Sequence, residues 1–306
     1  MSNWSCSEPY NSVYLEQTQF GLQVAPCCVA KIQPYDCNYD LHNQPYLQDI
    51  KQQFNNDIVP DACNRCVYHE QNGYKSRRQS TGQQPVRNKL KNLEIHVGNY
   101  CNLKCVICNN GWSSAWRKDA EALGFETYNN FKFDPDSINA DLNTVEWIHF
   151  NGGEPLFTNI HLDVLNRIPN TSQCIVYYNT NGTIRVKPSV FELWSKFKLV
   201  KLVFSIDDIG TRFNYQRTNA DWNEVESNMF WYKETAPVNM MFGINRTVSK
   251  LNQPYLGELD EWFAQHFATN RLGDPNDFSE QLAGGPTALD SKTYEDYISR
   301  LDTIRS

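Results

Sequence analysis

Apolar and polar positions change their pattern near residue 93, and this change divides the chain into two parts. In the first part, the apolar runs 13–15 and 22–25 flank a short turn, which predicts a β-hairpin. Residues 47–54 place Leu, Ile and Phe on one face of a predicted short helix. Residues 71–92 are polar and contain Gly and Pro, which predicts a connecting segment between the two parts.

After residue 92, apolar runs typical of strands alternate with helical patterns. The predicted strands are 93–97, 145–150, 174–178, 199–205 and 238–244. The predicted helices are 113–123, 190–197, 222–233 and 255–267. This alternation predicts an α/β fold with a parallel sheet and right-handed crossovers. The stretch 268–289 is rich in Gly, Pro and Asp and gives no clear pattern for a sixth strand.

The composition is that of a globular protein with a sizeable core, at 306 residues, 40% apolar and 13% aromatic. No apolar run approaches the roughly 18 residues of a membrane span, and the first residues lack the pattern of a signal peptide. We therefore expect a cytoplasmic protein with no membrane partner. The net charge of −7 argues against a general binder of polyanions.

One stretch departs from this acidic balance, because residues 71–93 contain six cations and no acid. The cations are Lys75, Arg77, Arg78, Arg87, Lys89 and Lys91. Such a run is typical of a solvated linker, and the alternative is a patch that faces an acidic substrate or a nucleic acid.

The ten cysteines are unevenly distributed, since nine of them lie within the first 108 residues. A disulfide framework needs an oxidising compartment, which nothing in the sequence suggests. Clustered cysteines in a cytoplasmic protein indicate metal binding instead.

The segment CNLKCVIC follows the first predicted strand and contains Cys101, Cys105 and Cys108. Three thiolates can bind three irons of a four-iron cluster and leave the fourth without a protein ligand. S-adenosylmethionine (SAM) can chelate that iron through its amino and carboxylate groups, so that an electron enters the sulfonium. Homolysis then yields methionine and a 5′-deoxyadenosyl radical. A structural zinc site, the alternative, normally has four ligands with paired Cys-x2-Cys spacing, which this triplet fits poorly.

With this triplet after the first strand, residues 93–267 resemble the core of the radical SAM superfamily. One departure is Ile107, where the family usually has an aromatic residue near the adenine. The resemblance implies a partial (β/α)6 barrel, a 4Fe-4S cluster that binds SAM, and an external electron donor such as flavodoxin or ferredoxin.

The second strand runs into Gly152, Gly153, Glu154 and Pro155. Two glycines let the backbone approach a ligand closely, and a glutamate can pair with an ammonium group. Alone, these four residues would be typical of a simple turn. At a strand end after the cysteine triplet, they resemble the family motif that binds the amino group of SAM.

Polar residues also follow the third and fourth predicted strands. In the resemblance, Asn181, Ser205 and Asp207 stand where the family contacts the ribose and the methionyl end of SAM. Arg217 is a candidate for the SAM carboxylate, and Arg212 competes with it. All of them are expected at the carboxyl ends of strands, where parallel α/β folds bind ligands.

A second set of cysteines precedes the barrel. The predicted ligands are Cys6, Cys27, Cys63 and Cys66, the last two on a tight turn. Cys28 is the alternative to Cys27. Four thiolates can close a zinc site equally well, so zinc is the alternative to iron and sulfur.

Residues 1–80 resemble the twitch domain, a short form of the SPASM domain that holds an auxiliary 4Fe-4S cluster. In most of that family it follows the barrel, whereas here it would precede it. The expected organisation is therefore a twitch-like domain (1–80), a linker (81–92), the barrel (93–267) and a C-terminal extension (268–306).

The resemblance implies hydrogen abstraction from a substrate, and we expect oxidative modification of a peptide or protein. The alternatives are modification of a nucleic acid or nucleotide, or a non-catalytic iron–sulfur or zinc-binding module. The sequence assigns no catalytic side chain. His96 and His149 lie within predicted strands and are expected to be core histidines with satisfied hydrogen bonds.

Overall fold

The computed structural model describes residues 4–267 and 279–282. Nine strands of this part form one sheet in the order β11-β10-β8-β7-β6-β4-β1-β2-β3. A second, two-stranded sheet pairs β5 (Lys104–Cys105) with β9 (Arg217–Thr218) in antiparallel fashion. None of the helices within the described residues has the length and apolar character needed to cross a membrane.

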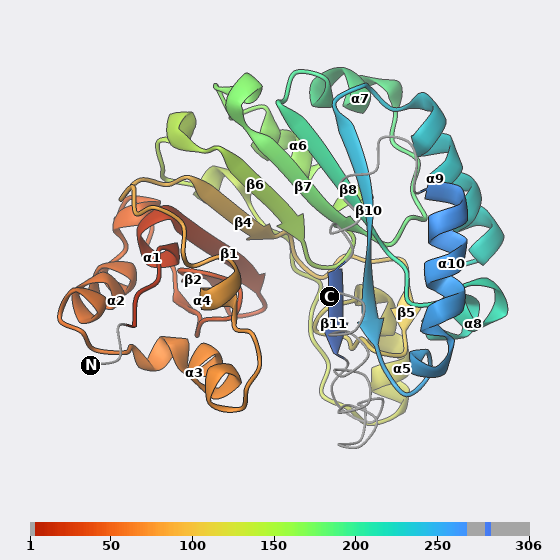
Figure 1. Ribbon diagram of the computed structural model, residues 1–306, viewed down its shortest axis with the longest axis horizontal. Helices are drawn as coiled ribbons and strands as arrows, with labels where there is room; N and C mark the ends of the chain where they lie inside the picture. Colours follow the sequence, from red (N-terminus) through yellow and green to blue (C-terminus); the bar gives the residue numbers. More distant parts are fainter. Residues whose placement is uncertain (1–3, 268–278, 283–306) are drawn as a thin grey trace.

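Parallel strands form the larger part of the main sheet, and Figure 1 shows them curving as a partial barrel. They are β4 (Asn92–His96), β6 (Trp147–Asn151), β7 (Ile175–Thr180), β8 (Leu199–Ser205), β10 (Met240–Val248) and β11 (Ser279–Leu282). Each pairs in parallel with its neighbour. The five predicted strands and the parallel α/β fold are therefore confirmed, and β11 is the sixth strand that the sequence pattern did not reveal.

The helices of this part lie outside the curved sheet, with α7, α9 and α10 along its convex side (Figure 1). They are α5 (Arg117–Ala122), α6 (Ile160–Leu165), α7 (Pro188–Trp194), α8 (Gly210–Gln216), α9 (Trp222–Thr235) and α10 (Leu256–Phe267). The four predicted helices appear as α5, α7, α9 and α10, whereas α6 and α8 were not predicted. Short 3-10 turns are η1 (Leu41–Asn43), η2 (Asp61–Cys63), η3 (Ser114–Trp116), η4 (Pro135–Ser137), η5 (Leu142–Thr144), η6 (Pro155–Phe157), η7 (Thr171–Gln173) and η8 (Gln253–Tyr255).

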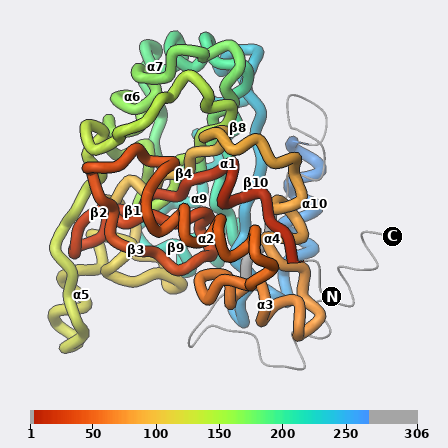
Figure 2. The backbone as a smooth tube through the Cα atoms, turned by 90° about the vertical axis from the view of Figure 1, so that its left-hand side faces the viewer, coloured from red at the N-terminus to blue at the C-terminus, as the bar shows by residue number. Residues whose placement is uncertain are grey.

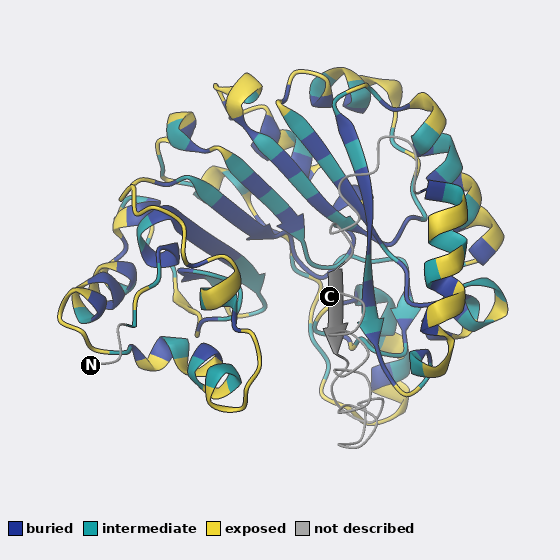
Figure 3. Cartoon of the chain, in the orientation of Figure 1, coloured by how far each residue is buried: buried dark blue, intermediate teal, exposed yellow. Residues whose placement is uncertain are grey.

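The core forms where the outward side chains of the strands meet these helices. On β6 and β7, Ile148, Phe150, Val176 and Tyr178 are fully buried, and they alternate with partly exposed residues. Figure 3 shows this alternation along the strands and the exposed residues on the outer surfaces of the helices. One face of the sheet is thus buried under helices, and the other is its concave inner face.

The first part of the chain builds a smaller layer that continues the same sheet. Its elements are α1 (Glu8–Asn11), β1 (Ser12–Thr18), β2 (Gly21–Ala25), β3 (Gln33–Pro34), α2 (Pro45–Asn55), α3 (Asn64–Gln71) and α4 (Arg77–Ser80). The predicted hairpin is confirmed as β1 and β2, and the predicted helix as α2. Because β1 also pairs in parallel with β4, the hairpin extends the edge of the barrel sheet.

Most of residues 71–92 are exposed, as expected for a solvated segment, but several contacts also fasten this segment to the N-terminal residues. Figure 2 shows α3 and α4 close together, and Arg78 on α4 pairs with Glu70 on α3 at 2.6 Å. The backbone oxygen of Gly82 accepts a hydrogen bond from the Ser7 amide at 2.7 Å. Farther along the segment, the side chain of Asn11 donates a hydrogen bond to the backbone oxygen of Pro85 at 2.8 Å. It also accepts one from the backbone amide of Arg87 at 2.7 Å.

Candidate functional site

The cysteine triplet lies on the loop after β4, which we call the cluster loop (residues 101–108). The pairing of β5 with β9 places Arg217 beside Cys105, with 3.9 Å between Nη1 and the sulfur. The same guanidinium forms an ion pair of 2.8 Å with Asp207, and both side chains are buried. A buried arginine next to a thiol supplies positive charge where the thiol must lose its proton.

Burial strongly affects the three thiols of the cluster loop. It raises the pKa of Cys101 to about 11 and that of Cys108 to about 12. It also raises the pKa of Cys105, against the opposing charge of Arg217. Metal ligation requires thiolates, and a bound cationic centre offsets the cost of burying them. One buried and two half-buried thiols on one short loop are therefore a donor set that fits an iron–sulfur cluster.

Binding of a single metal ion requires a tighter arrangement of ligands. Within the residues that the structure describes, no group of three or more His, Cys, Asp or Glu side chains is placed to hold one metal ion. The thiolates of one zinc ion would stand about 4 Å apart, given zinc–sulfur bonds of about 2.3 Å. In a four-iron cluster each cysteine binds a different iron, so the sulfur atoms of its cysteine ligands stand farther apart than those around one zinc ion.

Glu154 lies at the carboxyl end of β6 with its carboxylate fully buried. One oxygen accepts hydrogen bonds from the Leu156 amide at 3.0 Å and the Thr180 hydroxyl at 2.8 Å. The other accepts from the Asn181 amide at 2.6 Å, which leaves this oxygen a second lone pair. Burial raises the pKa of Glu154 to about 7, although these hydrogen bonds oppose the change.

The two glycines before Glu154 are required by close contacts within the protein itself. A Cβ on Gly152 would lie 2.1 Å from the His96 ring, and one on Gly153 would lie 2.3 Å from the Tyr100 carbonyl oxygen. Both glycines also have positive φ, of 83° and 50°. The close approach expected from the sequence was to a ligand, whereas in the structure it is to β4 and to Tyr100, just before the cluster loop.

The loop after β7 connects this glutamate to the cluster loop. The Asn181 side chain donates to Asn102 at 2.9 Å and lies 3.9 Å from the sulfur of Cys101. Pro155 begins the turn η6 directly after Glu154. The structure thus brings together the GGEP segment, Asn181 and the cluster loop.

The fourth strand supplies the other predicted contacts. Ser205 is the last residue of β8 and is partly exposed. Asp207 follows it and is held from β10, because the Thr247 amide donates to its carboxylate at 2.7 Å. Arg212 is placed elsewhere, in ion pairs with Asp208 and Glu258 on the outer side. Of the two competing arginines, only Arg217 reaches the cluster loop.

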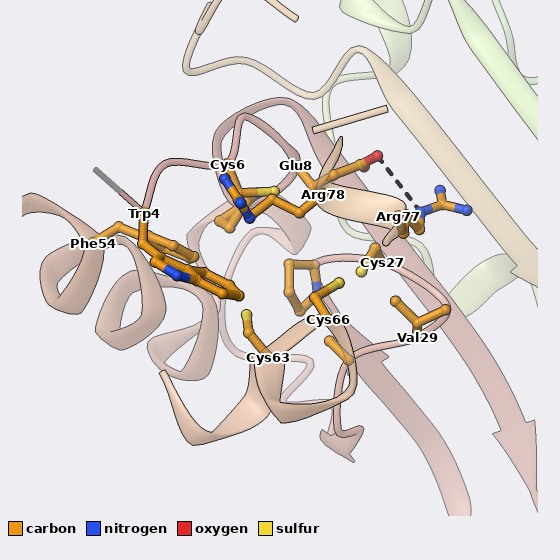
Figure 4. Close-up of a pocket in the computed structure, with 13 residues that line it drawn as sticks. Trp4, Cys6, Glu8, Cys27, Val29, Phe54, Cys63, Cys66, Arg77 and Arg78 are labelled. Atoms are coloured by element: carbon orange, nitrogen blue, oxygen red, sulfur yellow. Dashed lines mark ion pairs between the residues drawn. The ribbon is translucent and has the colours of Figure 1, made fainter. Parts of the chain in front are cut away.

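A pocket in the N-terminal layer is lined by Cys6, Cys27, Cys63 and Cys66. Their sulfur atoms border the same space, flanked by Trp4 and Phe54 (Figure 4). Burial raises the pKa of Cys6 and that of Cys63 to about 12, and raises the pKa of Cys27 well above its usual value. The four predicted ligands therefore lie together. As in the cluster loop, a bound cationic centre would offset the cost of burying their thiolates.

Two details of this pocket differ from the sequence analysis or go beyond it. Cys63 and Cys66 do not lie on a tight turn, because Cys63 ends η2 and Cys66 lies in the first turn of α3. Cys28 does not line the pocket, since its sulfur accepts a hydrogen bond from Arg77 at 3.2 Å.

The expectation of a satisfied core histidine is wrong for His96. Its ring is buried against Gly152 and Trp112, and neither nitrogen has a hydrogen-bond partner among the described residues. Burial lowers the pKa of His96 to about 4, so the ring is neutral. Buried polar atoms without partners are rare in folded proteins, and these lie at the strand end that carries the GGEP segment.

His149 has hydrogen-bond partners, but they form a charged group on the inner face of the sheet. Its Nδ1 lies 3.3 Å from the carboxylate of Glu94 on β4, and its Nε2 lies 3.1 Å from the amide nitrogen of Asn179 on β7. The carboxylate of Glu94 also accepts hydrogen bonds from the side-chain amide of Asn151 at 2.8 Å and from the guanidinium of Arg77 at 3.4 Å. The sequence analysis missed this group.

A sequence signal for it exists. On β4 the apolar residues Leu93 and Ile95 point outward, so Glu94 and His96 must point inward. The same period of two places His149 inward on β6. Charged residues at inward positions of adjacent strands were the available clue.

Comparison with known proteins gives no family, since no family model matches the chain. An uncharacterized protein of Methanocaldococcus jannaschii is 28% identical over 183 residues, which cover 55% of this chain and 57% of that protein. Among solved structures, a histidine-tagged form of anSMEcpe with bound AdoMet matches 71% of this chain and 58% of its own, with 16% identity and a TM-score of 0.50. Streptococcus suis SuiB bound to S-adenosylmethionine matches 98% of this chain and 69% of its own, with 16% identity and a TM-score of 0.44.

This chain therefore spans less than three fifths of the length of the M. jannaschii protein and of anSMEcpe. The likeness to anSMEcpe concerns the fold, and it agrees with the partial barrel that the radical SAM resemblance implied.

Proposed function

We propose that the chain is a radical SAM enzyme in which Cys101, Cys105 and Cys108 hold a 4Fe-4S cluster. When bound, the cluster and SAM would supply a 5′-deoxyadenosyl radical that abstracts hydrogen from a substrate. The protein's own residues bind SAM, orient it and exclude water.

The observation that carries the proposal is the contact of two side-chain groups with the thiols of the cluster loop. Asn181, whose amide donates to Glu154, lies 3.9 Å from the sulfur of Cys101, and Arg217, paired with Asp207, lies 3.9 Å from the sulfur of Cys105. They join the carboxyl ends of β6, β7 and β8 to one loop, as a ligand site of a parallel α/β fold requires.

The chemistry of these groups fits the methionyl part of SAM. The remaining lone pair of Glu154 can accept a hydrogen bond from an ammonium group, and the guanidinium of Arg217 can donate to a carboxylate. The unpartnered nitrogens of His96 lie at the same strand end. That anSMEcpe shares this fold and is described with bound AdoMet adds support.

We further propose that Cys6, Cys27, Cys63 and Cys66 hold an auxiliary 4Fe-4S cluster. Support comes from their shared pocket and from the position of Cys28 outside it. Four ligands leave no open iron for SAM, so cleavage of SAM is assigned to the cluster loop and electron transfer to the auxiliary site.

For the substrate we propose a peptide or protein that undergoes oxidative modification, as the twitch-like resemblance implies. The cationic stretch does not favour a nucleic acid, because Arg77, Arg78 and Lys91 are engaged in ion pairs. The external electron donor would be a flavodoxin or ferredoxin.

The decisive experiment incubates anaerobically reconstituted, reduced protein with SAM and measures 5′-deoxyadenosine. We expect cleavage by the wild-type chain and none by a variant with alanine at all three cluster-loop cysteines. A matched control replaces Cys174, a buried cysteine on the helix side of the barrel, with alanine. Cleavage at the native rate by the triple variant would refute the proposal, and a folded wild-type protein that binds iron without cleaving SAM would be a non-catalytic module.

A further inference from the structure

Arg77 stands between the four-cysteine pocket and the inner face of the barrel. It lines the pocket together with Cys27. Its guanidinium donates to the sulfur of Cys28 at 3.2 Å and pairs with Glu8 at 3.5 Å. On its other side it reaches the carboxylate of Glu94 at 3.4 Å. A single cation therefore borders both sites.

Glu94 is an ionised carboxylate held by this arginine and by His149. Burial alone would raise its pKa, but the hydrogen bond and charge of His149, together with the charge of Arg77, outweigh burial and lower the pKa of Glu94. The carboxylate is 7% exposed, so its charge acts on its neighbours with little screening by water. A change of charge beside Arg77 therefore changes the electrostatic potential at the pair of Glu94 and His149.

The pair belongs to a row of residues that crosses the concave face in register. Tyr14 on β1 pairs with Glu94, Glu94 with His149, His149 with Tyr177 on β7, and Tyr177 with Lys201 on β8. The charged and titratable groups that face the pair are Glu8, Tyr14, Cys28, Arg77, Tyr177 and Lys201. None of these six side chains is an imidazole, the group that normally gains a proton near neutral pH; the pair itself contributes it through His149.

Asn179 allows His149 to exist in either protonation state. The carboxylate of Glu94 faces Nδ1, which therefore carries a proton, and Nε2 accepts from the amide nitrogen of Asn179. The amide oxygen of Asn179 is buried and has no hydrogen-bond partner among the described residues. If Nε2 gains a proton, a half-turn of the amide gives that oxygen a hydrogen-bond donor.

We propose that uptake of one electron at the four-cysteine site is accompanied by uptake of one proton at Nε2 of His149. This inference rests on the proposed function, because it requires a cluster that accepts an electron in that pocket. The electron adds a negative charge next to Arg77 and offsets part of its effect on Glu94. The proton comes from solvent or from the substrate, a new N–H bond forms on the imidazole, and Glu94 stabilises the cation.

For a substrate radical that carries an O–H, N–H or S–H group, both products of its oxidation then have a destination. One electron leaves the radical carbon to the auxiliary cluster, the X–H bond breaks and its electron pair completes a C=X double bond, and the proton goes to His149. His149 is thus a catalytic acid–base residue, and Glu94 and Arg77 are positioning residues.

The test is a redox titration that needs no substrate. The chain with alanine at the three cluster-loop cysteines is reconstituted with iron and sulfide, so that only the auxiliary cluster is present. Its midpoint potential is then measured by electron paramagnetic resonance from about pH 6 to about pH 9, the range in which imidazole titrates. We expect the potential to fall with rising pH, with a limiting slope of about 59 mV per pH unit for one proton per electron.

Substitutions assign the proton. His149→Gln keeps hydrogen-bonding groups but cannot bind the proton, and should give a potential independent of pH. The matched control is His266→Gln, on α10 at the outer side, which should keep the native slope. If His149→Gln loses its cooperative melt, Arg77→Gln provides the second test, because it should reduce the pH-dependent change while leaving His149 intact.

The outcomes are distinct. A pH-independent potential in the parent chain, or a native slope in folded His149→Gln, would overturn this inference and leave the auxiliary cluster standing. Zinc in the pocket and no reducible signal would overturn both the auxiliary cluster and the inference.

Discussion

Replacing Gly152 with alanine tests how the GGEP segment is held against β4. The new Cβ would lie 2.1–2.5 Å from three atoms of the His96 ring, and the residue has φ of 83°. The left-handed backbone costs about 1–2 kcal/mol for a residue other than glycine. Forcing an extra methyl group into a packed site adds about 1–3 kcal/mol. The expected loss of stability is therefore about 2–5 kcal/mol.

The chain contains a control that separates these two costs. Gly124 has φ of 71°, but nothing lies within 4 Å of the point that a Cβ on this residue would occupy. Gly124→Ala should therefore lose only the backbone part, about 1–2 kcal/mol. Chemical denaturation of the two anaerobic apo-proteins measures the difference, and equilibrium dialysis with SAM on reconstituted protein measures the effect on the ligand. We expect weaker SAM binding for Gly152→Ala alone, because Glu154 moves with the loop.

A third variant shows whether the His96 ring is the obstacle. In the double variant Gly152→Ala with His96→Ala, the methyl group gains room, so the two losses should not add. A coupling energy of roughly 1–3 kcal/mol is expected for residues in such contact. If Gly152→Ala is no less stable than Gly124→Ala, or if its loss adds fully to that of His96→Ala, the steric reasoning is wrong.

The remaining predictions concern metal content, ligand choice and acid stability. Reconstituted protein should carry about eight irons, from two four-iron clusters, and the variant lacking the cluster-loop cysteines about four; elemental analysis that finds zinc in their place would contradict the auxiliary cluster. Cys27→Ser should lose the auxiliary cluster spectrum and Cys28→Ser should retain it, while equal loss in both would mean that the pocket is wrongly assigned. Burial lowers the pKa of His161 to about 3, below that of the unfolded chain, so this residue should lower wild-type stability by up to about 1.4 kcal/mol per pH unit as the pH drops below about 6.5, and the buried His96 adds to this dependence. His161→Phe should flatten this dependence in denaturation at pH 7 and pH 5, and an unchanged slope would show that the ring is not buried neutral.

Much of the barrel was predictable because its strands bury one complete face under helices. The outward residues of β4, β6, β7 and β8 are apolar at every second position, and tertiary packing reinforces the pattern. The strand β11 (Ser279–Leu282) was not predictable, because four residues lie within a stretch rich in Gly, Pro and Asp. Its place is set by pairing with β10, which is a long-range contact.

In the segment from residue 71 to residue 92, solvent exposure was predictable from composition, whereas the ion pairs of Arg77 and Arg78 were not. Its polar composition favoured a solvated linker, but polar residues also form buried hydrogen bonds and ion pairs when partners are available. The partners here are acids, Glu8 and Glu70, that lie near the start of the chain or on α3. Composition carries no information about such partners, because they depend on which elements the fold places side by side.

The choice between Cys27 and Cys28 depended on structure for the same reason. Adjacent residues point in different directions, so only one of the two can face the pocket readily, and the sequence does not say which. The structure favours Cys27, since the guanidinium of Arg77 donates to the sulfur of Cys28 while Cys27 lines the pocket. The same arginine reaches Glu94, which lies in register with Tyr14 of the N-terminal hairpin. The parallel pairing of β1 with β4 therefore fixes the position of the four-cysteine pocket relative to the inner face of the barrel, which a flexible connection between two separate domains would not.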